Sequence, residues 1–438
     1  MINNNTTNRS YMDLIPVCII FASFGPYIFP SYGMRSEHIL IYSLLLFAVP
    51  FYLIRQRFIR WSPPLLATLV LLIGITLWTM GSSMFGGYST VSFSKYLSSL
   101  ENYIQPIAVI ILILVFARYA SYAGFLNCFK RLCRILIFLL CLNSIIAGCS
   151  IFFDLSGFLR PFVFSCFGDV SVSELASSQG RYSGVFNQPF ESGLTYSLGL
   201  LAWGYLKRVS LKTGFIDYCL LLMMIIGGAL SVSKVFILGG IPLLIFYWNP
   251  LGNLKKYFNR YFFLAVIVGT FGILLLIQFW SGWDYLYRLF KIGGGINLVE
   301  LYTGGRFGAE YSTMSSNFAR VWQESPMYGF GFGNTSCFDN AYLEFFLQGG
   351  LIALFGYLIL LDIYFWYSLR SFMTGYEEGR LLLAFFVLVM GGSFGAPVLT
   401  INRFSTIFWA LSAFLFLMLQ ARRRDEIKKH QALNYAQT

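Results

Sequence analysis

Two arginines lie in segments that could bind a phosphate group. Arg181 begins the stretch RYSGVFNQP at 181–189, and Arg306 follows a pair of glycines. The planar guanidinium group donates two parallel hydrogen bonds and keeps its charge at any relevant pH, so arginine is well suited to hold phosphate oxygens. For Arg181 the alternative is an interfacial side chain that reaches lipid head groups. The further cationic candidates are Arg288, Arg320 and Lys234.

Arg306 and Arg320 belong to one predicted helix, which covers residues 306–324. Its apolar stripe is formed by Phe307, Tyr311, Met314, Phe318 and Trp322. Spacings of four and three predict an amphipathic helix that lies on the membrane or on other loops. Glu310 and Glu324 each follow an arginine by four residues, so a solvated face with two weak ion pairs is the alternative to a binding role. An unbroken helix would separate the two arginines by about 21 Å, so at most one can belong to a single anion site.

The composition predicts that these residues are carried by an all-α polytopic membrane protein. Of the 438 residues 57% are hydrophobic and 11% charged, and the mean hydropathy is +0.67. A soluble globule of this size would need more polar surface. Apolar runs of about 16–22 residues can cross a hydrocarbon core of about 30 Å, and we predict about twelve of them in a single bundle over residues 1–438. They lie near 13–31, 38–54, 64–80, 102–118, 134–153, 190–206, 214–231, 235–248, 261–280, 339–365, 381–397 and 405–420.

Lysine and arginine are concentrated in alternate loops. These are 55–63, 118–134, 207–213, 249–260, 368–380 and both termini. Because cytoplasmic loops carry an excess of positive charge, both termini are predicted to be cytoplasmic in a multi-pass protein. The net charge of +12 is then mostly a topology signal. Nucleic acid is not an expected partner, since there is no basic soluble domain with interleaved aromatic residues.

Two loops on the predicted outer side are longer than connection requires. They cover residues 154–189 and 281–338. Both contain aromatic residues, which are rare in disordered segments. Loops of more than about 12–15 residues are uncommon in compact proteins unless they have a function. The working site is therefore expected on the outer face.

Metal-binding residues are scarce in this sequence. His38 and His430 are the two histidines, and no acidic cluster or Cys-x-x-Cys pair occurs on the predicted outer side. We therefore predict no metal and no cofactor. Cys166 and Cys337 are the cysteines predicted to face the oxidising side, and whether they form a disulfide stays open.

Several short segments together resemble the O-antigen polymerase and ligase superfamily (Wzy and WaaL), in their order and in their positions relative to the spans. They are RYSGVFNQP at 181–189, GGR at 304–306, VWQESP at 321–326, GFGFG at 329–333 and DNAYLEFFLQGGLI at 339–352. The stretch GGALSVSKVFILGG at 227–240 is similar to the superfamily's short span pair, with Lys234 in place of an arginine.

This resemblance implies a metal-independent glycosyltransferase of the bacterial inner membrane with a periplasmic active site. Its substrate would be an undecaprenyl-diphosphate-linked oligosaccharide, and membrane lipids, a chain-length regulator and a flippase would be its other partners. Arg181 and Arg306 match the superfamily's functional arginines, which favours Arg306 over Arg320. The ligases have His-Asn where this chain has Asp339-Asn340, so the polymerases are the closer match.

Asp339 is the candidate general base of such a reaction, because a carboxylate there could take the proton from an acceptor hydroxyl. The structural alternative is a capping box from Ser336 to Asp339, in which the acid only stabilises the start of a helix. Other bases would be Glu191, Glu310 and Glu344. Substrate-binding candidates besides the cations are Asn187, Gln188, Asn340, Tyr342 and Glu344. The glycines of 329–333 would let the backbone pass close to the substrate or to the bundle, and Pro326 would end the amphipathic helix.

Proteins with other functions would place their charged residues differently relative to the spans. A lipid-linked oligosaccharide flippase or a secondary transporter should carry charges inside its spans, along a cavity reached from both sides. Few such charges are evident, and Asp217 and Asp362 lie near predicted cytoplasmic ends. A ligase-type transferase and the peptidoglycan polymerases of the shape and division family are the nearest enzymatic alternatives.

Overall fold

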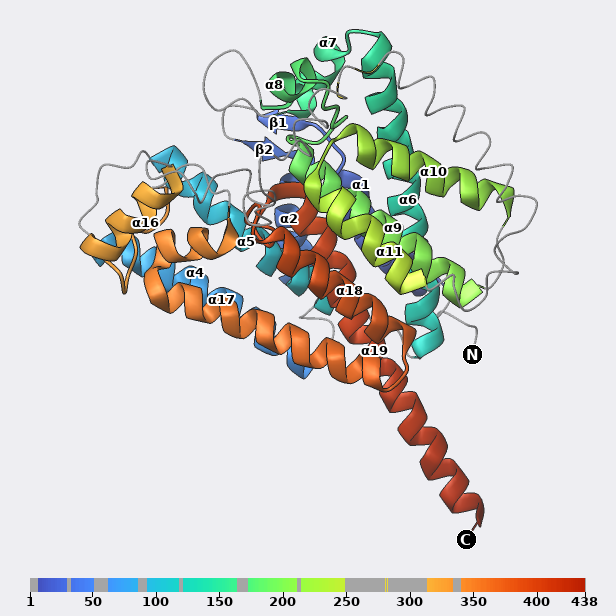
Figure 1. Cartoon of the computed structure of the whole chain (residues 1–438). Helices are drawn as coiled ribbons and strands as arrows, with labels where there is room; N and C mark the ends of the chain where they lie inside the picture. The colour runs from blue at the N-terminus through green and yellow to red at the C-terminus, as the bar shows by residue number, and fades with distance from the viewer. Residues whose placement is uncertain are drawn as a thin grey trace, which may run out of the picture.

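The structure is a computed structural model that describes residues 7–29, 33–50, 62–85, 93–117, 121–163, 172–210, 214–248, 280, 282, 313–333 and 340–437. Helices dominate these residues (Figure 1). The described sheet is one antiparallel pair, β1 (Tyr27–Phe29) and β2 (Met34–Arg35). The fold is that of an all-α membrane protein, as the composition predicts.

The first half of the chain contributes α1 (Thr7–Ala22), α2 (Ser36–Ser43), the π-helix η2 (Leu44–Ala48), α4 (Pro63–Phe85), α5 (Phe93–Phe116), α6 (Tyr122–Phe152), α7 (Ser156–Leu159), the 3-10 helix η3 (Arg160–Phe162), α8 (Val172–Ser178) and α9 (Pro189–Ser210). The second half contributes α10 (Phe215–Leu230), the π-helix η4 (Phe236–Gly240), α11 (Ile241–Trp248), α16 (Thr313–Glu324), α17 (Ala341–Met373), α18 (Glu377–Gly392) and α19 (Asn402–Gln437).

Five described helices are long and apolar enough to cross a membrane. Their spanning segments are Pro63–Met84, Lys95–Phe116, Tyr122–Phe152, Ala341–Met373 and Arg403–Ala432. Even the shortest, of 22 residues, extends for about 33 Å, slightly more than the hydrocarbon core. The other predicted spans that fall within the described residues also overlap a helix, whereas 261–280 lies almost wholly outside those residues.

The predicted first span, 13–31, is wrong at its C-terminal end. Helix α1 ends at Ala22, and the chain then enters β1. Gly25 packs so closely that a Cβ there would lie 2.0 Å from the Oγ atom of Ser36, and Pro26 cannot donate a backbone hydrogen bond to continue the helix. Apolar composition alone could not show this turn.

Helix α19 forms the centre of the bundle. The most apolar part of its spanning segment is 94% buried, and the helix packs against α1, α5, α6, α9 and α18. A helix that is apolar on all sides is expected in such a position. Its C-terminal part projects from the bundle (Figure 1). Helix α17 lies outside this core, between α4 and α18.

Charged residues meet at the end of the bundle nearest the C-terminus. Arg208 donates to both carboxylate oxygens of Glu377, at 2.6 and 2.7 Å, and Arg422 contacts Glu378 at 2.8 Å. Lys207 lies 2.5 Å from Asp217. We call this group the basic end. It joins segments that the distribution of lysine and arginine assigns to one side of the membrane.

The opposite end carries the strands. We call it the hairpin end and define it by β1 and β2, the segment 181–188, the turn 231–234 and the loop 393–401. Figure 1 shows β1 and β2 beside α7 and α8 at this end, away from the C-terminus. The site residues predicted from sequence can now be placed relative to these two ends.

Candidate functional site

The segment that begins with Arg181 is fixed to the bundle by one side chain. Asn143 of α6 accepts a hydrogen bond from the Val185 amide at 2.8 Å and donates to the Ser183 carbonyl at 3.2 Å. Gly184 has φ +63°, and a Cβ there would lie 2.1 Å from the Asn143 Oδ1 atom. Only glycine therefore fits this turn without strain. The loop therefore has a defined conformation, although its sequence is short and polar.

The same segment touches the turn that carries Lys234. The Tyr182 amide donates to the Leu230 carbonyl at 2.9 Å, at the last residue of α10. Residues 231–234 then turn the chain into η4 and α11, so the helical hairpin expected at 227–240 is confirmed. Arg181 and Lys234 are both half-buried. Two of the predicted cationic residues are thus carried by segments in direct contact at the hairpin end.

The glycine-rich segment 329–333 packs against a break in α17. Gly350 has non-helical angles, φ 65° and ψ −162°, so carbonyls before it lose their usual helical donors. The Gly331 amide instead donates to the Gln348 carbonyl at 2.8 Å. A Cβ at Gly329 would lie 2.6 Å from the Gly350 nitrogen. The expectation that these glycines let the backbone pass close to the bundle is confirmed.

Helix α16 confirms the C-terminal part of the predicted amphipathic helix. It ends at Glu324, shortly before Pro326 as predicted. The rings of Phe318 and Trp322 contact Phe346 of α17 with centroid distances of 5.2 and 6.3 Å. The helix therefore lies on the N-terminal part of α17.

Arg320 lies on a solvated helix face and forms a weak ion pair, which was the alternative to a role in phosphate binding. Its Nε atom lies 3.2 Å from Glu324, and its guanidinium carbon lies 4.8 Å from the centre of the Phe330 ring. The side chain is 52% exposed, so this ion pair contributes little. Several other predicted residues lie outside the described residues, namely Arg288, Arg306, Glu310, Ser336, Asp339, Cys166 and Cys337.

The start of α17 corrects the proposed capping box. Asn340 is the N-cap, and its side-chain oxygen accepts from the Leu343 amide at 3.0 Å. The helix therefore begins at Ala341, five residues after Ser336. Glu344 is 2% exposed and accepts a hydrogen bond from the Thr400 hydroxyl at 2.9 Å. The observed contacts of Asn340 and Glu344 are thus made within the protein.

The other predicted polar residues are half-buried at the hairpin end. Tyr342 packs against Phe394 with a centroid distance of 5.1 Å. Asn187 and Gln188 precede α9, and the Asn187 amide donates to Glu191 Oε2 at 3.2 Å. Glu191 itself is fully buried. Glu191 also accepts a hydrogen bond from the backbone amide of Arg403, a residue that the sequence analysis did not single out.

Arg403, at the start of α19, joins segments that are far apart in the sequence. It is fully buried, and its backbone amide donates to Glu191 Oε1 at 2.9 Å. Its guanidinium group donates to the carbonyls of Val185, Gly25 and Phe162, the last two at 2.9 Å. One signal was available: an arginine on the predicted outer side is an exception to the positive-inside rule.

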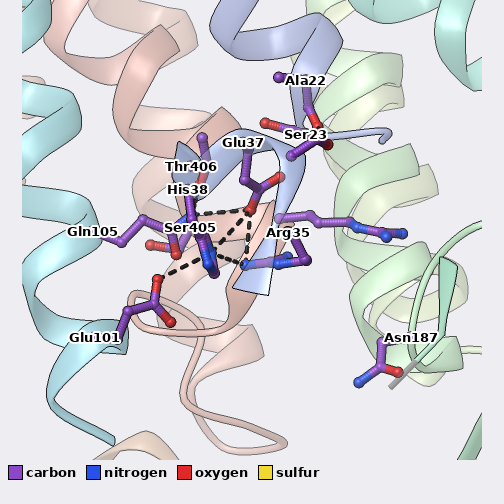
Figure 2. A network of polar contacts seen from close by, with 12 residues as sticks. Ala22, Ser23, Arg35, Glu37, His38, Glu101, Gln105, Asn187, Ser405 and Thr406 are labelled. Carbon is purple, nitrogen blue, oxygen red and sulfur yellow. Dashed lines mark hydrogen bonds and ion pairs between the residues drawn. The ribbon is translucent and has the colours of Figure 1, made fainter. Parts of the chain in front are cut away.

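A second buried network was also missed (Figure 2). Arg35 Nη2 lies 2.8 Å from Glu37 Oε1 and 2.7 Å from His38 Nε2. Gln105 of α5 donates to the same Glu37 oxygen at 2.9 Å, and Glu101 Oε1 lies 3.0 Å from His38 Nε2. These contacts connect β2 and α2 to α5.

The charges in this network are not equally accessible. Arg35, Glu37 and His38 are at most 2% exposed, whereas Glu101 is 26% exposed. Burial lowers the pKa of Arg35, but Glu37 and Tyr27 raise it, and the net pKa lies above its ordinary value. Arg35 is thus a fixed cation. His38 Nε2 can either accept from Arg35 or donate to Glu101, so the position of one proton decides which bond forms.

Comparison with family models and with curated proteins finds no match to this chain. Within the described residues, no group of three or more His, Cys, Asp or Glu is arranged to hold a metal ion. The fold and the buried polar groups define a helical, membrane-embedded protein. Its two ends differ: the basic end carries partly exposed ion pairs, and the hairpin end carries the buried side chains of Arg35 and Arg403.

Proposed function

We propose that the protein is a surface-polysaccharide polymerase of the Wzy type. It would transfer a growing glycan from undecaprenyl diphosphate to the non-reducing end of a new lipid-linked repeat unit. The observation that carries this proposal is the contact between the Arg181 segment and the Lys234 turn, made by the hydrogen bond from Tyr182 to Leu230. Two segments that each carry a cationic residue are thereby joined at one end of the bundle, and cationic side chains bind phosphate oxygens strongly.

The arrangement of the two ends supports a periplasmic active site. Positive-inside topology would put the basic end in the cytoplasm. The hairpin end would then face the periplasm of a bacterial inner membrane, with about twelve spans and both termini on the cytoplasmic side. A polymerase that receives flipped lipid-linked units needs its site on that face.

The proposed reaction is a displacement at a sugar C1 atom. The bond between C1 and a diphosphate oxygen breaks, the acceptor hydroxyl oxygen bonds to C1, and the hydroxyl proton passes to a base. Arg181 and Arg306 would stabilise the negative charge that develops on the departing diphosphate. Asp339 would accept the proton. Lys234 and Arg288 would provide the positive field that holds the lipid-linked substrate near the site.

Polymer formation in cells that lack their own polymerase tests this function. Arg181→Ala and Arg181→Lys should both abolish long polymer, because lysine cannot replace a two-pronged hydrogen-bond donor. The protein should still insert at wild-type levels. Arg320→Ala is the matched control, since its ion pair is exposed and its loss should leave polymer length unchanged. Wild-type polymer from Arg181→Ala would refute the assignment.

A transporter of lipid-linked oligosaccharide is the second candidate. Glu101 is the observation that favours it, since this residue of the apolar helix α5 contacts His38 of the buried network and ionisable residues within membrane helices often mark transport pathways. Reconstituted vesicles distinguish the two functions. A transporter moves a fluorescent lipid-linked sugar across the bilayer and leaves its length unchanged, whereas a polymerase lengthens the glycan.

A further inference from the structure

An apolar groove of about 550 Å³ runs along the surface between two helical segments. One wall is formed by residues 235–246 of η4 and α11, and the other by residues 387–394 at the end of α18. Its walls are open to the surroundings: Phe246 is 68% exposed and Phe394 47% exposed. In a membrane protein such a groove faces lipid.

The groove has the length of one membrane leaflet. The lining residues Val235, Leu238, Pro242 and Phe246 recur along one face of the helical segment. The eleven steps from residue 235 to residue 246, at a rise of about 1.5 Å each, extend for roughly 16 Å, which is about half of a hydrocarbon core of about 30 Å. An elongated lipid chain would fit this shape better than a compact ligand.

One end of the groove adjoins the candidate site. Val235 directly follows Lys234, in the turn that the Arg181 segment contacts. On the other wall Phe394 follows Ser393, whose carbonyl accepts a hydrogen bond from the Ala341 amide at the start of α17. The groove thus begins beside Lys234 at the hairpin end and runs toward the basic end.

We propose that this groove holds the polyprenyl chain of the lipid-linked substrate, with the diphosphate at its Lys234 end. This inference rests on the proposed function and adds the path of the lipid. The chain would leave one apolar environment for another, so the groove contributes shape and orientation more than hydrophobic free energy. A chain aligned in this way would hold the sugar C1 atom at a fixed position relative to Arg181.

Gly239 provides a way to block the groove. It lines the groove, and a Cβ there meets no atom closer than Leu388 Cδ1 at 3.9 Å, which is ordinary contact. Gly239→Phe should therefore fold while its ring occupies the space of the chain. Gly74→Phe and Gly148→Phe are matched controls on α4 and α6, because a Cβ at either position meets nothing within 4 Å.

The probe is undecaprenyl diphosphate with a photoreactive diazirine in the middle of its chain, added to the full-length protein in nanodiscs. The cross-links should map to residues 235–246 and 387–394. Gly239→Phe should lower their yield about tenfold, the change that corresponds to roughly 1.4 kcal/mol of lost binding free energy. The two control variants should cross-link as the wild type does, and excess phosphatidylglycerol should not compete.

The possible failures are distinguishable. Cross-links that map elsewhere, or that persist in Gly239→Phe while Arg181→Ala abolishes polymer, overturn the groove assignment and leave the proposed function intact. Equal competition by phosphatidylglycerol would show that the groove holds ordinary membrane lipid, which also overturns the assignment. No specific cross-linking at all, together with normal polymer from Arg181→Ala, overturns both proposals.

Discussion

Replacing Arg403 by lysine should destabilise the protein although the charge is kept. The guanidinium group reaches three carbonyls that belong to separate segments, those of Gly25, Phe162 and Val185. A lysine ammonium group is a single point on a flexible stem, and it lacks the planar fork. It can retain at most one of these three contacts in the same geometry.

The size of the effect follows from the two carbonyls left without a donor. Each buried polar group that loses its partner costs about 1–3 kcal/mol, so Arg403→Lys should lower the free energy of unfolding by about 2–6 kcal/mol. This is a large part of the roughly 5–15 kcal/mol that stabilises a typical protein. The hairpin end should open before the basic end, because the three carbonyls belong to the segment 181–188, to the residues that precede β1 and to η3, which Arg403 joins.

Thermal unfolding of the purified protein in detergent measures this change, with size-exclusion chromatography to follow the folded fraction. Arg320→Lys is the control, since that side chain is 52% exposed and should shift stability by less than about 0.5 kcal/mol. Arg181→Lys should also melt like the wild type while losing activity. An Arg403→Lys variant as stable as the control would refute the reasoning.

Three further outcomes are expected. Gly331→Ala should cost about 1–3 kcal/mol of stability, because the residue has φ +75° and its Cβ would lie 2.2 Å from Ser83 Oγ; thermal unfolding measures this. Glu378→Gln should cost about 1–3 kcal/mol, because the buried carboxylate accepts hydrogen bonds from Arg422 and Tyr122, and limited proteolysis should then cleave the tail of α19 sooner. Asp339→Asn should abolish polymer without affecting insertion, as measured by polymer length in cells.

Each of these has its own check. Gly74→Ala should be neutral or slightly stabilising, because its Cβ meets no neighbour and alanine favours helix. Glu377→Gln affects a more exposed ion pair, so it should cost less than Glu378→Gln. If Asp339→Asn made polymer at the normal rate, the base would have to be another group.

The helices could be predicted from sequence because their signal is local. Runs of apolar residues have the length of a membrane, and the spacing within 313–324 has the period of a helix. The turn at 231–234 and the end of α16 before Pro326 depend on neighbouring residues only. The N-cap of α17 was misassigned because serine and asparagine are both good caps, and local sequence does not decide between Ser336 and Asn340.

The buried networks could not be predicted, because their partners are distant in sequence. Gln105 binds Thr406, which lies 301 positions away, and Arg403 binds the Val185 carbonyl across 218 positions. Only the fold brings such groups together. Charged residues on the predicted outer side, such as Arg35 and Arg403, were the available signal, and that signal gives no partners.

The break in α17 also determines how this segment can fit the thickness of a bilayer. An unbroken helix of 33 residues would be about 50 Å long, well beyond a hydrocarbon core of about 30 Å. Gly350 divides it, and residues 351–373 alone extend for about 35 Å. The piece 341–349 is then free to lie at an angle to the membrane normal, as its separate direction in Figure 1 indicates. The short piece 341–349 then packs against α16 through Phe346, apart from the longer piece that has the length of a membrane span.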